Sequence, residues 1–208
     1  MKHSRQKLKK TGNMMNNISA QAAFEKAFEC NQQGNFEEMM KYLDYAANKG
    51  HLMAMHQKGY MLLFQDRKEE AINWLTKAGE GGLIEAFYTL GNCFYYGQCC
   101  ISQDYTKAIP YFKIAAEQGH PQAQCNLGAC YYYGQGTQVD YDKAFEWYSK
   151  SAAQGEANAQ FNVGVCYENG QGVAEDRQKA FMFFKEAAQQ GHERAEARVN
   201  LYLNASKQ

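Results

Sequence analysis

The sequence predicts an all-α fold in which antiparallel helix pairs stack into a solenoid, and three observations support this. Similar segments recur along the 208 residues, and each ends in a glycine, at Gly50, Gly82, Gly119, Gly155 and Gly191. An alanine keeps the same register, at Ala22, Ala54, Ala86, Ala123, Ala159 and Ala195. Within each segment the apolar residues follow the spacing of a helix face. A repeat of 32 to 37 residues is typical of arrays in which each unit buries its surface against its neighbours.

The first helix of each unit is predicted from apolar and small residues at i, i+3, i+4 and i+7. Ala123, Leu127, Gly128 and Tyr131 show this pattern in "AQCNLGACYYYG". The same pattern occurs in the preceding unit from Ala86 onward. One face of this helix is therefore expected to be buried.

The second helix of each unit is predicted from its cap residues and its apolar run. Asp104, Asp140 and Asp176 precede "KAIPYFKIAA", "KAFEWYSKSAA" and "KAFMFFKEAA", where a carboxylate can accept a hydrogen bond from a free backbone N–H. The glycine that closes each unit suits the left-handed position after a helix, because it has no Cβ.

These signals divide the chain into a basic tail over residues 1–19, predicted to be disordered, and one solenoid domain over residues 20–204. The domain contains five helix pairs at residues 20–51, 52–83, 84–120, 121–156 and 157–192, followed by a capping helix at residues 193–204.

The segments "AQCNLGACYYYGQGTQVDYDKAFEWYSKSAAQG" and "AQFNVGVCYENGQGVAEDRQKAFMFFKEAAQQG" resemble the Sel-one-like repeat, a relative of the tetratricopeptide repeat. The shared pattern is A-x-x-x-L-G-x-x-Y-x-x-G-x-G followed by K-A-x-x-x-[WYF]. The first two units have shorter loops and are closer to the tetratricopeptide form, and the third has "GQCC" in place of Gly-x-Gly. The resemblance implies a right-handed superhelix that serves as an interaction scaffold rather than as a catalyst.

Composition narrows the possible partners. Lysine plus arginine and aspartate plus glutamate each total 22, so net charge does not draw the protein to nucleic acid or to anionic membranes. Residues 1–19 hold five basic residues and no acid, which leaves 17 basic against 22 acidic residues elsewhere. The tail lacks the apolar run of a signal peptide, and no apolar stretch approaches a transmembrane helix. A cytoplasmic protein without membrane insertion is expected.

The residues that suggest chemistry have structural explanations. Cys93, Cys130 and Cys166 recur once per unit on the core side of the first helix, too far apart to share a disulfide or a zinc ion. Cys99 and Cys100 lie in a loop, and their reactivity stays open. The Gly-x-Gly turns follow a helix and lack phosphate-loop spacing. The sequence predicts no cofactor, no metal and no catalytic residue, and His51, His120 and His192 mark the junctions.

One feature favours binding. A second face of the first helices, directed away from their own core, carries aromatic residues where a solvated face is usually polar. Either neighbouring helices cover these side chains, or they line a concave groove for a ligand. The predicted protein-binding residues are Tyr60, Phe64, Tyr88, Asn92, Tyr95, Tyr96, Tyr132, Tyr133, Phe161 and Glu168.

The predicted function is a non-catalytic scaffold or adaptor that binds a protein or peptide in this aromatic groove. Two alternatives stay open. One is an enzyme, such as a hydrolase, whose site assembles in the groove from distant residues. The other is a nucleic-acid contact through the basic tail, which the acidic body weakens.

Overall fold

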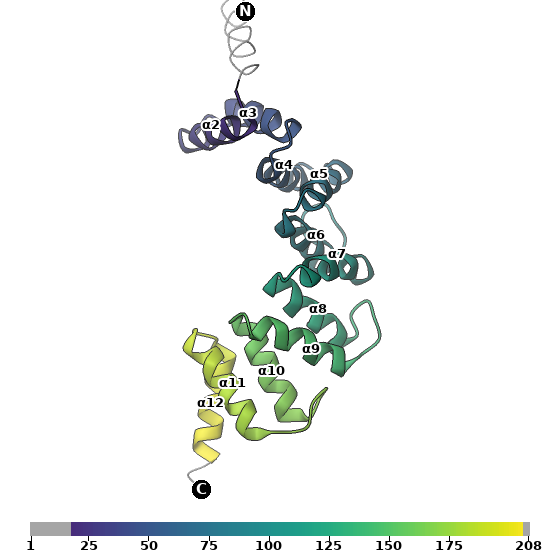
Figure 1. Ribbon diagram of the computed structural model, residues 1–208, viewed down its shortest axis with the longest axis vertical. Coiled ribbons are helices and arrows are strands. Elements are labelled where there is room, and N and C mark those ends of the chain that lie inside the picture. Colours follow the sequence, from purple (N-terminus) through teal and green to yellow (C-terminus); the bar gives the residue numbers. More distant parts are fainter. Residues whose placement is uncertain (1–17, 206–208) are drawn as a thin grey trace, which may run out of the picture. The chain divides into compact units, whose positions relative to one another are not determined.

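A computed structural model describes residues 18–205 (Figure 1), and in this range the chain forms eleven α-helices and no strand. The predicted all-α fold of helix pairs is thereby confirmed. The helices are α2 (Ala20–Gln32), α3 (Phe36–Asn48), α4 (Leu52–Phe64), α5 (Lys68–Glu80), α6 (Ile84–Tyr96), α7 (Tyr105–Glu117), α8 (Pro121–Tyr133), α9 (Tyr141–Ala152), α10 (Ala157–Asn169), α11 (Arg177–Gln189) and α12 (Glu193–Ala205). The predicted tail lies almost wholly outside the described residues.

The chain divides into two compact units, and each is described by itself. The first ends at Ala86 and also takes in Cys99–Ile101. The second comprises Phe87–Gln98 and continues from Ser102. The first unit therefore holds α2 to α5, and the second holds most of α6 and the helices from α7 to α12.

The three long loops after α6, α8 and α10 each end at an aspartate that caps the next helix. The backbone N–H groups of Lys107, Lys143 and Lys179 donate to Asp104, Asp140 and Asp176 over 3.1, 2.9 and 2.9 Å. The N–H of each aspartate in turn donates to a carbonyl near the end of the preceding helix, such as Tyr131 for Asp140 at 2.9 Å. The predicted N-caps are confirmed, and they fix the start of each second helix.

A glycine in the first helix of a pair makes room for a large side chain of the second. A Cβ added to Gly128 of α8 would lie 2.7 Å from the ring of Tyr148 in α9, and one added to Gly164 of α10 would lie 2.7 Å from the Phe184 ring in α11. Tyr148 and Phe184 are among the largest fully buried side chains. These contacts form the centre of each pair.

The chain leaves each second helix through a glycine with positive φ, as at Gly119 (φ 90°) and Gly155 (φ 87°). An L side chain at this φ would be strained, which explains why glycine closes each unit. Within residues 18–205, every helix is too short to cross a membrane.

Candidate protein-binding surface

Two of the predicted binding residues use their hydroxyl groups to join consecutive helix pairs. The Tyr95 hydroxyl, at the end of α6, donates to Oε1 of Gln135 in the loop after α8. The Tyr132 hydroxyl, at the end of α8, donates in the same way to Gln171 in the loop after α10. Burial raises the pKa of both tyrosines, so both hydroxyls keep their protons at neutral pH. Each bond reaches from one repeat to the loop of the next.

The glycines that flank these glutamines allow the loops to lie directly on the backbone of the preceding repeat. A Cβ on Gly136 would lie 2.6 Å from the carbonyl carbon of Tyr105, and one on Gly172 would collide with the carbonyl oxygen of Tyr141. Both glycines have positive φ, 72° and 71°. The Gly-Gln-Gly turns are therefore junction elements that pack without a side chain.

The neighbouring tyrosines are the exposed ones. Tyr96 is 54% exposed and Tyr133 is 61% exposed. Each stands edge-on against the junction tyrosine beside it, with ring centroids 4.8 Å apart for Tyr95 and Tyr96 and 4.9 Å apart for Tyr132 and Tyr133. We call these four residues, at the ends of α6 and α8, the tyrosine surface.

Two further predicted residues lie nearer the start of α6. Asn92 is half-buried, and its Oδ1 accepts a hydrogen bond from Nδ2 of Asn126 in α8 over 3.1 Å. Tyr88 is also half-buried and stacks on the ring of His120, with centroids 4.4 Å apart. His120 caps α8 through Nδ1, which accepts from the N–H of Ala123.

The stacking of a junction histidine on an earlier aromatic ring occurs three times and was not predicted from the sequence. His51 stacks on Phe24 at 4.3 Å, and His192 stacks on Phe161 at 4.7 Å. The sequence does contain a signal for this contact. A histidine follows the closing glycine of each of these three units, and each of the three has an aromatic residue two positions after the recurring alanine of its first helix. In the fourth unit, which has Cys125 at that position, the junction residue Glu156 caps α10 instead.

Phe161 and Glu168 differ from the predicted outward position. Phe161 is only 3% exposed, because the rings of His192 and Phe184 cover it. Glu168 ends α10, where its carboxylate accepts from Tyr202 over 3.1 Å and pairs with Arg198 over 3.0 Å. Neither side chain joins the tyrosine surface.

Tyr60 and Phe64 belong to the first unit. Tyr60 is 46% exposed and Phe64 is 67% exposed, and their rings meet edge-on at 5.1 Å. Tyr60 also borders a shallow pocket of about 270 Å³ between α3 and α4, together with Phe36 and Met61.

The thiols of the second unit are poor nucleophiles. Cys93, Cys130 and Cys166 are buried as predicted, and burial raises the pKa of Cys130 and Cys166 to about 12. Almost no thiolate forms at neutral pH at such values. In the first unit Cys99 is exposed and Cys100 is half-buried. No group of three metal-ligating side chains occurs among the described residues.

The comparison with protein families decides the identity of the repeats. The model of the Sel1 repeat matches residues 52–83, 85–120, 121–156 and 157–192. This chain belongs to the Sel1 repeat family. Proteins built from Sel1 repeats generally act as non-catalytic interaction scaffolds.

Solved Sel1 repeat structures share the fold. A protective antigen of uropathogenic Escherichia coli that displays an SLR fold is 34% identical over 74% of this chain, with a TM-score of 0.68. A Sel1 repeat protein from Oxalobacter formigenes is 29% identical over 80%, with a TM-score of 0.70. This Sel1 repeat chain spans 34% and 49% of those two proteins. Cysteine rich protein B of Helicobacter pylori is 25% identical over 64% of this chain and 95% of its own, with a TM-score of 0.50. No curated protein matches.

Proposed function

We propose that this Sel1 repeat protein is a non-catalytic scaffold that binds a peptide or protein segment on the tyrosine surface of its second unit. The observation that carries the proposal is the exposure of Tyr96 and Tyr133, 54% and 61%, at equivalent places in consecutive repeats. Tyrosine is enriched among the residues that dominate protein interfaces, because it combines a large apolar ring with a polar tip.

The exposed rings are already held in place before a ligand arrives. Tyr96 packs against Tyr95, whose hydroxyl is bound to Gln135, and Tyr133 packs against Tyr132, which is bound to Gln171. Binding would then cost little side-chain entropy, since the rings have few conformations to lose.

The asparagine pair next to the tyrosine surface can recognise a polypeptide backbone. Nδ2 of Asn126 donates to Oδ1 of Asn92, and within the described residues these two side chains make no other hydrogen bond. Both amide N–H groups of Asn92, one amide N–H of Asn126 and the Oδ1 acceptor of Asn126 remain. They match the C=O and N–H groups that an extended ligand presents.

In the first unit, Tyr60 and Phe64 are proposed to provide a separate contact. Their exposed rings adjoin the pocket that Phe36 and Met61 border, so the surface is apolar and accessible. An apolar side chain of a partner would fit such a pocket.

The proposal is tested by affinity capture from a native lysate with the full chain as bait. Replacing the exposed rings, in Tyr96→Ser/Tyr133→Ser, should remove the specifically retained proteins. The matched control is Ile114→Ser/Val139→Ser, which changes two other exposed apolar residues of the second unit, 36% and 52% exposed. Retention of the same proteins at the same level by both double variants would place the binding surface elsewhere.

A further inference from the structure

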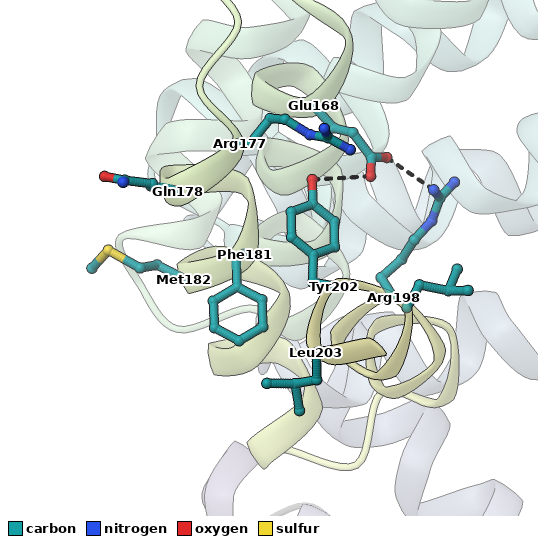
Figure 2. A pocket seen from close by; sticks show the side chains of 9 residues that line it. Glu168, Arg177, Gln178, Phe181, Met182, Arg198, Tyr202 and Leu203 are labelled. Carbon is teal, nitrogen blue, oxygen red and sulfur yellow. Dashed lines mark hydrogen bonds and ion pairs between the residues drawn. The ribbon is translucent and has the colours of Figure 1, made fainter. Parts of the chain in front are cut away.

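A groove lies at the C-terminal end of the second unit (Figure 2). It encloses about 840 Å³ between the start of α11 and the end of α12, with Glu168 of α10 at its inner edge. Its size is that of a ligand-binding pocket. Phe181 and Tyr202 line it, and Met182 and Leu201 at its border are 60% and 61% exposed.

The groove lies at a position of the fifth repeat that can be compared with the third and fourth repeats. The helix-capping aspartates align Arg177 with Tyr105 and Tyr141. The recurring alanines of the first helices, Ala86, Ala123 and Ala159, align Glu168 with Tyr95 and Tyr132. In the third and fourth repeats, these aligned residues are covered by a loop of the next repeat, the one that follows its first helix.

The coverage in the earlier repeats is close. Gln135 and Gln171 accept from the tyrosines, and Gly136 and Gly172 lie on the backbone of Tyr105 and Tyr141. Helix α12 takes the place of a following first helix, yet no loop covers Arg177 or Glu168 within residues 18–205. Within residues 18–205, the groove is therefore the junction surface of the fifth repeat with no loop packed on it.

The charged side chains in the groove favour a negatively charged ligand. Arg198 is paired with Glu168, and the Glu168 side chain, 16% exposed, also accepts from Tyr202. Arg177 is exposed and lies over the Tyr202 ring, 5.8 Å from its centroid, with no ion pair among the described residues. Two arginines and one carboxylate leave an excess positive charge in the groove, which a carboxylate supplied from outside can pair with at Arg177.

The same charges make a second copy of this chain an unfavourable ligand for the groove. Symmetric pairing of two such grooves would bring the Arg177 and Arg198 side chains of both copies together, and like charges at an interface are costly.

We propose that this groove binds an acidic, apolar segment of a partner protein, seated where the preceding repeats hold the Gly-Gln-Gly loop of the next repeat. Apolar side chains of the segment contact Phe181, Met182 and Leu201, and a carboxylate pairs with Arg177. This contact is separate from the tyrosine surface.

The test uses the full chain and a fluorescein-labelled 16-residue amphipathic peptide with leucine and phenylalanine on one helical face and glutamate elsewhere. A matched peptide carries lysine in place of glutamate. Fluorescence anisotropy should show saturable binding of the acidic peptide and at least 10-fold weaker binding of the lysine peptide. Equal binding of both peptides, or no saturable binding of the acidic one, would overturn the proposal.

Variants locate the contact. Arg177→Gln and, independently, Met182→Ser should each weaken the acidic peptide at least 5-fold, whereas Lys185→Gln, which changes another exposed cation of α11, should not. Because Arg177 and Met182 are exposed, both variants should keep the melting temperature of the parent. Equal losses of affinity for Arg177→Gln and Lys185→Gln would mean that only the overall positive charge of α11 matters. That result would contradict binding in the groove.

Two further outcomes would contradict the proposal that the groove binds an acidic segment of a partner. Loss of peptide binding in Tyr96→Ser/Tyr133→Ser would assign the peptide to the tyrosine surface instead. A concentration-dependent dimer in sedimentation that Arg177→Gln dissociates would make a second copy the occupant.

Discussion

At the scale of single residues, the histidine at three of the repeat junctions combines a helix cap with a stacked ring. Nδ1 of His51 accepts from the N–H of Ala54, its Nε2 lies 2.9 Å from Oε1 of Gln21, and its ring stacks on Phe24. A protonated imidazole has no acceptor nitrogen, and its charge is unfavourable at a helix N-terminus. The cap therefore requires the neutral ring.

This requirement predicts a pH dependence of stability in the first unit. Burial lowers the folded-state pKa of His51, against the opposing charge of Glu25, and burial also lowers the pKa of His56, against Glu85. The unfolded state then binds more protons as the pH falls below the ordinary histidine pKa of about 6.5, so stability is full above this pH and is lost below it.

The measurement is denaturant unfolding of the full chain at several pH values between 7.5 and 5.5. In His51→Asn the asparagine keeps a cap acceptor but does not titrate. The loss of stability over this range should be smaller in the variant, with His56 accounting for part of the remainder. An identical pH dependence in both proteins would show that His51 does not contribute.

At the scale of helices, the close approach within a pair predicts an unusual response to alanine. Alanine normally stabilises a helix relative to glycine by about 0.5–1 kcal/mol. In Gly128→Ala, however, the new Cβ would lie 2.7 Å from the Tyr148 ring, which is 1% exposed, so the buried ring or the helix would have to shift. We expect a loss of about 1–3 kcal/mol in the free energy of unfolding.

Chemical denaturation checks this prediction against Gln122→Ala, an exposed substitution in the same helix. The control should be within about 0.5 kcal/mol of the parent protein. Stabilisation by Gly128→Ala would mean that α8 and α9 do not pack as closely as described.

The helices and their ends could be predicted from sequence because their causes are local. The spacing of apolar residues, the caps Asp104, Asp140 and Asp176, and the closing glycines each act within a few residues of the element they define. The burial of Cys130 followed from the same helix face.

The candidate site was less predictable, because it depends on contacts between repeats. A helical wheel treats each helix alone, so it placed Phe161 outward, although the histidine of the next junction covers its ring. It also grouped Tyr95 with Tyr96, whereas the loop of the next repeat takes the Tyr95 hydroxyl and leaves Tyr96 exposed. The glutamine between two glycines was visible in the sequence, but its partner was not.

At the scale of the whole molecule, the residues that join the repeats differ from those proposed to bind a partner. Tyr95 and Tyr132 hold consecutive repeats together, whereas Tyr96 and Tyr133 are exposed, and we propose that their rings contact a partner. Because each pair stands side by side in sequence, substitutions one residue apart should affect different properties of the protein.

The most direct test measures stability and partner affinity in two double variants of the full chain, by thermal unfolding and by calorimetric titration with the captured partner. Tyr95→Phe/Tyr132→Phe removes two inter-repeat hydrogen bonds and should lower the free energy of unfolding by about 1 kcal/mol per bond while the affinity is kept. Tyr96→Ser/Tyr133→Ser should unfold like the parent protein and bind at least about 10-fold more weakly. The opposite pattern, with binding lost in the first variant and stability lost in the second, would contradict the account.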